Sequence, residues 1–396
     1  MPVYESLAKI FYKFPDQHQK IYRQRFDSPT SKHFDFHIKQ FNRKKVFPAF
    51  LCYSEELTLL VEKIYKKSES LSQLLKSVPP VVLRQFALAS VVDEVNAGNA
   101  IEGVHSTRRE LADVLQGVSD KPRFSSILQR YSDLISGTYY DFKSCSDLRN
   151  FYDNFAHSEV IRDNPKYKLD GKIFRREPVD ITSPTNKILH RGLYPEEKII
   201  SEMQKALQIL NDDCIPLLVR VSVFHYFFEY IHPFYDGNGR TARFIVSYFL
   251  ALHFHFLPAL RLSLTIKNQR KKYYDLFTVT DSEFNCGELT FFVQGFIEII
   301  SDTFDEIESI LNRKMIQLIK YQNLLNFRDP LTNLICSILL QASSFIGTGV
   351  SMEELMALTG KSRNTVKSRL KNLPSNYVIK SGVKKIFFKL NPFIFR

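Results

Sequence analysis

The segment from Ile231 to Arg243, IHPFYDGNGRTAR, limits the structures open to this chain more than any other stretch. It places a histidine, a carboxylate, two glycines, an asparagine and two arginines between two apolar runs that have helical periodicity. Two buried helices joined by a polar turn satisfy this pattern. The sequence therefore predicts a mainly helical protein with a functional loop between two core helices.

The middle of this segment has the features of an anion-binding turn. The Gly-Asn-Gly run at residues 237–239 can adopt backbone conformations closed to residues with a β-carbon, so that consecutive N–H groups converge on one anion. A helix is expected from Arg240 to His255, and its N-terminal dipole and unpaired N–H groups would add to the same cradle. Arg240 and Arg243 fall on one face of that helix and carry forked donors suited to phosphate oxygens. An ordinary Gly-Asn-Gly turn needs neither arginine.

Two further side chains add chemistry to this cradle. Asp236 supplies a carboxylate, the kind of ligand that Mg²⁺ accepts when it also holds substrate phosphates. His232 can take a proton near neutral pH. A base, a metal ligand and an anion cradle together indicate transfer of a phosphate-containing group.

The segment resembles the signature of the Fic family, HPFx(D/E)GNGRxxR. The matching positions are His232, Pro233, Phe234, Asp236, Gly237, Asn238, Gly239, Arg240 and Arg243. The resemblance implies a protein adenylyltransferase, which passes AMP from ATP to a hydroxyl of a target protein and releases pyrophosphate. Doc-type kinases depart from the signature at the acidic position and at the glycines. This chain keeps both, which favours AMP transfer over phosphate transfer.

The resemblance also implies a role for individual residues. His232 is the catalytic base, Asp236 holds Mg²⁺ and Phe234 is a buried anchor of the loop. ATP is bound by Gly237, Asn238, Gly239, Arg240, Arg243, Tyr274 and Glu102. Tyr274, in the run KNQRKKYYDLF, is the candidate to stack on the adenine base. Family members often have asparagine seven residues later, where this chain has Asp281.

A second resemblance lies upstream, where GNAIEG at residues 98–103 is similar to the Fic inhibitory motif (S/T)xxxE(G/N). The motif implies that Glu102 pairs with Arg243, so that this arginine cannot hold the γ-phosphate of ATP and the enzyme is autoinhibited. Gly98 stands where the family has Ser or Thr, and this departure bears on the strength of inhibition. Glu102 falls between two predicted helices, the second of which opens with a capping box at residues 107–110.

Composition and charge set the broad class of protein. With 396 residues and 44% hydrophobic content, the chain is long enough for two or three domains with substantial cores. Its five cysteines are far apart and form no CxxC pair, and Glu5 and Lys9 stand where a secretory signal would need an apolar core. The most apolar run, residues 244–260, is interrupted by polar residues and Pro258. We therefore expect a cytoplasmic protein without a membrane span.

We divide the chain into four parts. Residues 1–78 form a basic and helical extension, whose first 50 residues show no clear period and carry ten Lys and Arg against four Asp and Glu. Residues 79–165 form a helical segment with the inhibitory motif. Residues 166–328 form the catalytic core, and residues 329–396 form a C-terminal module.

One hairpin interrupts the helical pattern of the core. Residues 168–190 contain β-branched and aromatic side chains around a turn at Ser183-Pro184-Thr185-Asn186. The hairpin resembles the Fic flap, which implies that it holds a segment of the target as an added strand over His232. Taken alone, the pattern is equally compatible with a hairpin that has no such role.

The C-terminal module has the order helix, helix, helix, hairpin, which is that of a winged helix-turn-helix. Helices are expected from Leu331 to Ala342, after the cap Ser351 and after the cap Ser362, and a hairpin from Tyr377 to Leu390. Residues 330–396 have a net charge of +8. The third helix is expected to carry the basic residues Lys361, Arg363, Lys367, Arg369 and Lys371. Such modules bind DNA or protein, and both alternatives stay open. The expected fold is mainly α, with a Fic-type helical core, a small β-hairpin flap and a C-terminal winged helix.

Two functions follow from these patterns. The first is a protein adenylyltransferase with ATP as co-substrate and Mg²⁺ as cofactor, autoinhibited by Glu102, whose target is a Ser, Thr or Tyr hydroxyl of another protein or of the chain itself. The alternative is a DNA-binding regulator whose Fic core senses nucleotide or is silent. Removal of AMP from a modified target is a third activity that His232 and Glu102 could support. A homodimer is compatible with the sequence, and no membrane partner is expected.

Overall fold

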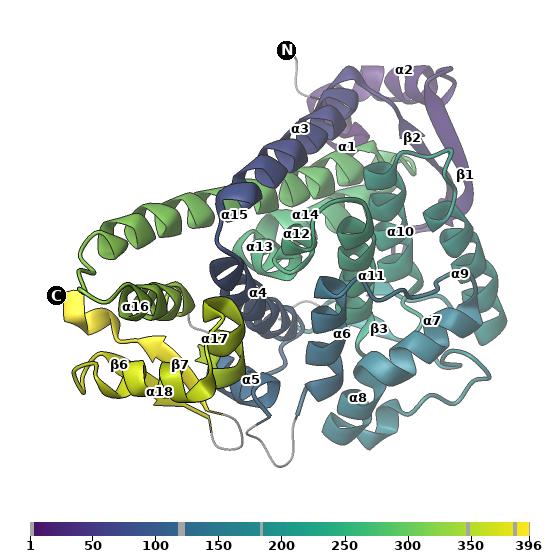
Figure 1. The fold of residues 1–396 in the computed structure, drawn as a ribbon. Coiled ribbons are helices and arrows are strands. Elements are labelled where there is room, and N and C mark those ends of the chain that lie inside the picture. The colour runs from purple at the N-terminus through teal and green to yellow at the C-terminus, as the bar shows by residue number, and fades with distance from the viewer. Residues whose placement is uncertain (1–3, 118–122, 183–184, 346–348, 383–385, 396) are drawn as a thin grey trace.

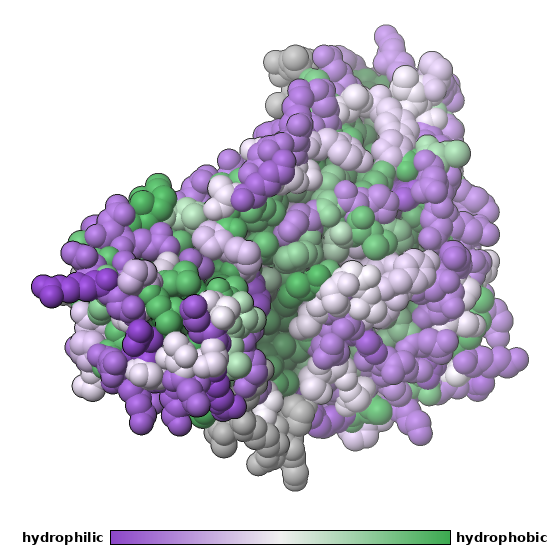
Figure 2. Space-filling model, in the orientation of Figure 1, coloured by the Kyte–Doolittle hydropathy of each residue, from purple (hydrophilic) through white to green (hydrophobic). Residues whose placement is uncertain are grey.

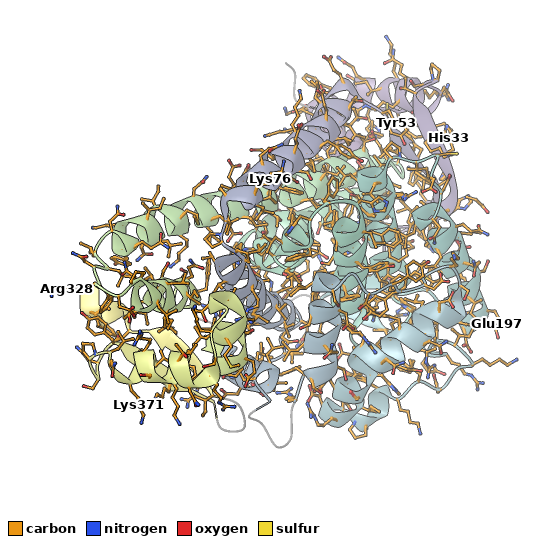
Figure 3. The ribbon with its side chains drawn as sticks, in the orientation of Figure 1. His33, Tyr53, Lys76, Glu197, Arg328 and Lys371 are labelled. Carbon is orange, nitrogen blue, oxygen red and sulfur yellow. The ribbon has the colours of Figure 1, made fainter. Side chains whose placement is uncertain are left out.

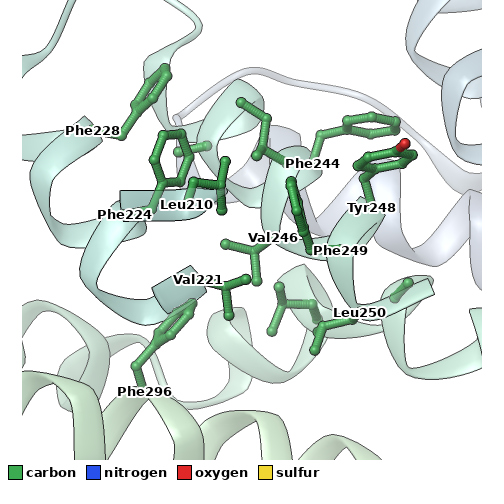
Figure 4. Close-up of a cluster of buried hydrophobic side chains, with 14 of the residues drawn as sticks. Leu210, Val221, Phe224, Phe228, Phe244, Val246, Tyr248, Phe249, Leu250 and Phe296 are labelled. Carbon is green, nitrogen blue, oxygen red and sulfur yellow. The ribbon is translucent and has the colours of Figure 1, made fainter. Parts of the chain in front are cut away.

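The two apolar helices that flank the polar turn lie at the centre of the molecule in the computed structural model, which describes residues 4–117, 123–182, 185–345, 349–382 and 386–395. They are α10 (Leu217–Ile231) and α11 (Asn238–His253), and nearly all of their side chains are buried. Figure 4 shows aromatic and branched side chains of both helices packed together. Each fully buried side chain of this kind contributes roughly 1.5–3 kcal/mol. The cluster therefore holds both ends of the turn in place.

The other core helices surround this pair (Figure 1). They are α6 (Ser125–Ile135), α7 (Cys145–Tyr152), α8 (Ser158–Asp163), α9 (Glu196–Leu210), α12 (Phe256–Ala259), α13 (Leu262–Asn268) and α14 (Arg270–Asp281), with a π-helical segment, Asp153–His157, between α7 and α8. The molecule is mainly helical, as the sequence predicts. None of the helices in the described ranges is both long and apolar enough to cross a membrane.

Two long helices run from the core toward the C-terminal module. They are α4 (Pro80–Ile101) and α15 (Thr290–Gln322), and α3 (Glu55–Ser77) packs along α15. After α4, the short helix α5 (Arg108–Leu115) begins with the predicted capping box, in which Thr107 and Glu110 bond each other's backbone. Glu102 is the C-cap of α4 and therefore lies between the two helices, as predicted.

The N-terminal region is more regular than the sequence analysis proposed. Helices α1 (Leu7–Lys13) and α2 (Pro15–Phe26) precede an antiparallel pair, β1 (Ser31–Ile38) and β2 (Phe47–Cys52). The expectation that residues 1–50 have no clear period was wrong, because Phe34, Phe36 and Ile38 alternate with exposed polar residues along β1. This alternation is the signal of a half-buried strand.

The predicted hairpin of the core is present but short. It pairs β3 (Asp180–Thr182) with β4 (Ile188–Arg191) in antiparallel register, with Ile181 opposite His190. Ser183 and Pro184 of the predicted turn lie outside the described residues. Residues 168–179, which are all described, contain no strand. One physical reason is that three consecutive backbone N–H groups there, those of residues 172–174, donate to the Glu196 carboxylate and are not free for a strand ladder.

The described residues of the C-terminal module contain three α-helices, three strands and a short 3-10 helix, Pro392–Phe395. The α-helices and strands are α16 (Pro330–Ala342), β5 (Val350–Ser351), α17 (Met352–Thr359), α18 (Arg363–Lys371), β6 (Val378–Ser381) and β7 (Phe387–Leu390), and the antiparallel sheet has the order β5-β7-β6. Ser351 and Ser362 cap α17 and α18 as predicted. Residues 383–385, within the predicted hairpin, lie outside the described residues. Figure 2 shows hydrophilic side chains over much of this module and a hollow between it and the core.

Candidate active site

The polar turn between α10 and α11 holds His232 in a left-handed backbone conformation (φ 54°, ψ 64°). His232 is the C-cap of α10, and its N–H donates to the carbonyl of Phe228 at 2.8 Å. A residue with a β-carbon adopts this conformation at an energetic cost, so the surrounding contacts must hold it. Backbone of this kind is concentrated at functional sites.

Phe234 and Asn238 hold the turn from inside. Phe234 is fully buried, and its ring stacks on that of Tyr152 with centroids 3.7 Å apart. The Asn238 side chain donates to the carbonyl of Phe234 at 2.8 Å and accepts from its N–H at 2.9 Å. Phe234 therefore has the buried position expected of an anchor. The side-chain amide of Asn238 therefore holds the turn, and its backbone lies in the first turn of α11.

The first turn of α11 has the geometry of an anion cradle. Gly237 is the N-cap, has a left-handed backbone (φ 80°) and supplies no capping side chain to the first N–H groups of the helix. Arg240 is buried, and its Nε and Nη1 have no hydrogen-bond partner in the described residues. Its Nη2 lies 3.7 Å from the carboxylate of Asp236. Buried donors without partners are costly, so this turn is suited to receive a phosphate.

Arg243 lies one turn further along α11 and is paired with Glu102. The Arg243 side chain is 1% exposed, and its Nη2 lies 2.8 Å from Glu102 Oε1. The same nitrogen donates to the carbonyl of Gly98 at 3.3 Å. The structure thus brings together the two residues predicted to pair. Gly239 lies so close to the Glu102 carboxylate that a β-carbon on this glycine would overlap it.

His232 lines the same cavity as this ion pair. Its side chain is 15% exposed, and its Nδ1 is 3.7 Å from the carboxyl of Glu229. Burial, followed by the charges of Arg175 and His190, lowers the pKa of His232 to about 3. The ring is therefore neutral at neutral pH.

A cavity of about 530 Å³ connects several of these residues. It is lined by four residues that the sequence identifies, His232, Glu102, Arg243 and Tyr274. Tyr274 is 41% exposed, so its ring is accessible to a ligand. Asp281 lines the same cavity and accepts a hydrogen bond from the hydroxyl of Tyr226 at 2.6 Å. Small-molecule pockets measure roughly 300–1,000 Å³, so the cavity has the size needed for a nucleotide.

Arg175 is a residue of the site that the sequence analysis missed. It is fully buried in the loop before β3, and its guanidinium donates to the carbonyls of His232 and Leu193, each at 2.9 Å. It therefore ties the end of the β3–β4 hairpin to the backbone of His232. No pattern marks it, because the run Arg-Arg-Glu-Pro has the composition of an exposed loop.

Glu229 was also missed. It lies one turn before His232 in the largely apolar α10, and its Oε1 is buried without a hydrogen-bond partner among the described residues. Burial, followed by the charge of Glu102, raises the pKa of Glu229 to about 8. A glutamate inside an apolar helix was the available signal, since buried carboxyls with shifted pKa values concentrate at functional sites.

Asp236, the predicted metal ligand, fits a magnesium ion that is held mainly by a nucleotide. Its carboxylate is 33% exposed and accepts the N–H of Gly237 at 2.5 Å. The described part of the chain contains no group of three or more His, Cys, Asp or Glu side chains that could hold a metal alone. Mg²⁺ bound by one carboxylate, phosphate oxygens and water needs no such group.

Comparison with known proteins agrees with this site. Residues 151–250 match the model of the Fic/DOC family. The fold is similar to that of a Fic family protein from Desulfovibrio desulfuricans G20, with a TM-score of 0.53 and 20% sequence identity. That similarity covers 86% of this chain and 97% of the other.

Two further structures show weaker similarity. A Fic domain containing signaling protein from Bacteroides thetaiotaomicron VPI-5482 has 16% identity and a TM-score of 0.45, over 64% of this chain and 95% of that chain. Fic-1 from C. elegans has 16% identity and a TM-score of 0.44, over 76% of this chain and 79% of that chain. The matched residues 151–250 include His232, the anion cradle and Arg243, so the candidate active site lies within the region that matches the Fic/DOC family model.

Proposed function

We propose that this chain is a protein adenylyltransferase, which moves AMP from ATP to a hydroxyl group of a target protein. The observation that carries the proposal is the state of two buried arginines in α11, the helix that follows the turn with His232. Arg240 has donors without partners, and Arg243 is held by a single carboxylate, that of Glu102. Two guanidinium groups on the helix that follows His232 can hold a polyphosphate, and the neutral imidazole can take a proton from an acceptor.

In the proposed reaction, His232 takes the proton of the target hydroxyl. The hydroxyl oxygen forms a bond to the α-phosphorus of ATP, and the bond from that phosphorus to the oxygen bridging to the β-phosphate breaks, so that pyrophosphate leaves. The first N–H groups of α11 and the guanidinium of Arg240 stabilise the charge on the phosphate oxygens. The β3–β4 hairpin would hold the target segment as an added strand, with its hydroxyl over His232.

The remaining predicted residues complete the nucleotide site in this proposal. Gly237, Asn238 and Gly239 contribute backbone N–H groups, and Tyr274 stacks on the base. Asp236 would hold Mg²⁺ against the phosphates, and the bound ion would neutralise part of their charge.

Glu102 makes the resting protein inactive in this account. Its carboxylate occupies Arg243, and its negative charge repels the γ-phosphate that would take its place. Displacement of this one side chain frees the arginine.

Transfer of label from ATP in the presence of Mg²⁺ tests the proposal. We expect label on protein, including the chain itself, to increase in Glu102→Gly and to be lost when His232→Ala is added, since a general base contributes about 10²–10⁴-fold. Glu197→Ala, which changes an exposed carboxylate of α9, is the matched control (Figure 3). Absence of label in Glu102→Gly would overturn the proposal.

A second function, DNA binding, is favoured by the surface of the C-terminal module. We propose that the module is a winged helix-turn-helix. Its α18 region exposes Lys361, Arg363, Lys367 and Lys371, whereas Arg369 pairs with Asp329. Figure 3 shows Lys371 at the outer edge of the module.

A gel shift with duplex DNA over a range of salt concentrations tests this function. The logarithm of the affinity should fall with the logarithm of the salt concentration, with a slope of about −0.9 for each phosphate contacted. Lys367→Glu should weaken binding to every sequence. Absence of binding at low salt would exclude this second function.

A further inference from the structure

Helix α4 belongs to two hydrophobic cores, one at each end. Val81 and Val82 in its first turn are buried among residues of the C-terminal module, including Leu339 of α16. In the next turn, Phe86 stacks on Phe345 with ring centroids 4.8 Å apart. The beginning of α4 is therefore packed as part of the module.

Polar contacts strengthen the junction between the first two turns of α4 and the C-terminal module. Arg84 forms an ion pair with Glu354 of α17 and donates to the carbonyl of Gly349 at 3.1 Å. The buried amide of Gln85 donates to the same carbonyl at 2.7 Å. Two side chains of α4 thus fix the segment that leads into β5.

The other end of α4 lies in the candidate active site. Its C-cap is Glu102, and the carbonyl of Gly98 in its last turn accepts from Arg243. Between the two ends, Glu94 is fully buried and accepts the backbone N–H of Ser263 at both carboxylate oxygens. A helix of 22 residues spans about 33 Å. One rigid element therefore joins the module to the ion pair (Figure 1).

We propose that the C-terminal module regulates the site by holding α4 in the position that places Glu102 on Arg243. This inference rests on the proposed function, because it names what sets the state of the inhibitory pair. The module contacts α4 at its first two turns, Glu94 fixes the middle of the helix, and Glu102 lies at its end. A displacement at the first turns therefore changes the fit of Glu102, as coupling through a rigid element requires.

Variants at the junction test the inference. Arg84→Ala and Gln85→Ala loosen the junction without touching the site, and we expect each to raise AMP incorporation about fivefold, the effect of losing roughly one hydrogen bond in a two-state element. Arg84→Lys keeps the ion pair and should return to the wild-type level. Lys66→Ala breaks the exposed Lys66–Glu62 pair on α3 and is the matched control.

The same changes in the Glu102→Gly background identify the route. If the module acts through Glu102, the junction variants cause no further increase in AMP incorporation in the Glu102→Gly protein. An equal increase in both backgrounds would overturn the inference, as would wild-type behaviour of both alanine variants alongside an active Glu102→Gly.

Calorimetric titration with ATP and Mg²⁺ separates this inference from the proposed function. We expect both the junction variants and Glu102→Gly to bind ATP more tightly than the wild type, whether or not transfer occurs. Tighter binding without label would contradict the adenylyltransferase and keep the coupling. Unchanged ATP affinity in the junction variants, with a gain in Glu102→Gly, would contradict the coupling alone.

Discussion

At the scale of single residues, Glu229 gives the site a distinct pH dependence. Burial, followed by the charge of Glu102, raises its pKa to about 8, so the folded protein keeps a proton that the unfolded chain releases at its ordinary pKa near 4.5. The contribution of this carboxyl to stability is therefore present at low pH and is lost as the pH rises toward 8. We expect Glu229→Gln to melt at a higher temperature than wild type at pH 8, with a smaller difference at pH 5. The exposed Glu197→Gln is the control, and equal melting temperatures at pH 8 would contradict the buried, protonated state.

The residues that the sequence could identify are those whose chemistry depends on local spacing. His232, Arg240 and Arg243 lie within one turn and one helix, so a short pattern contains all of them. Arg175 and Glu229 act through tertiary contacts. A buried arginine that bonds the backbone of a distant loop leaves no mark in its own neighbourhood of the sequence.

At the scale of elements, the turn between α10 and α11 depends on the side chain of Asn238. Asn238→Ala leaves the N–H and carbonyl of Phe234 unpaired, which should cost roughly 2–4 kcal/mol. We expect a lower melting temperature in the absence of any nucleotide, with Asn238→Asp intermediate because it keeps the acceptor and loses the donor. Thermal unfolding of the three proteins measures this. Loss of ATP affinity with an unchanged melting temperature would show instead that the amide binds phosphate.

The helices could be predicted because their caps and periodicity are local. The capping boxes at Thr107 and Ser351 were both found at the expected positions. Strand β1 was missed because residues 1–50 mix basic and aromatic residues without a clear overall period, although every second residue from Phe34 to Ile38 is buried. The hairpin of the core was predicted at the right place, but the predicted strands were too long. The reason is that backbone N–H groups before β3 bond the Glu196 carboxylate, and this contact depends on the tertiary fold.

At the scale of the whole molecule, α4 packs in two hydrophobic cores, although the sequence places it in a single part of the chain that begins at residue 79. Sequence patterns assign a helix to one part of the chain, whereas α4 packs its first turn in the C-terminal module and its last turn in the core. Helix α4 therefore links the C-terminal module, which carries the basic residues of α18, to the site that contains His232. Regulation and transfer are therefore expected to depend on each other.

In the proposed reaction, ATP binds with its α-phosphorus next to His232 once Glu102 has left Arg243. The most direct measurement uses the Glu102→Gly protein with Mg²⁺ and ATP that is labelled either at the α-phosphate or at the γ-phosphate. We predict that the α-label appears on protein and the γ-label in released pyrophosphate, and that both signals are lost when His232→Ala is added. A γ-label on protein, or no label on protein from either donor, would contradict it.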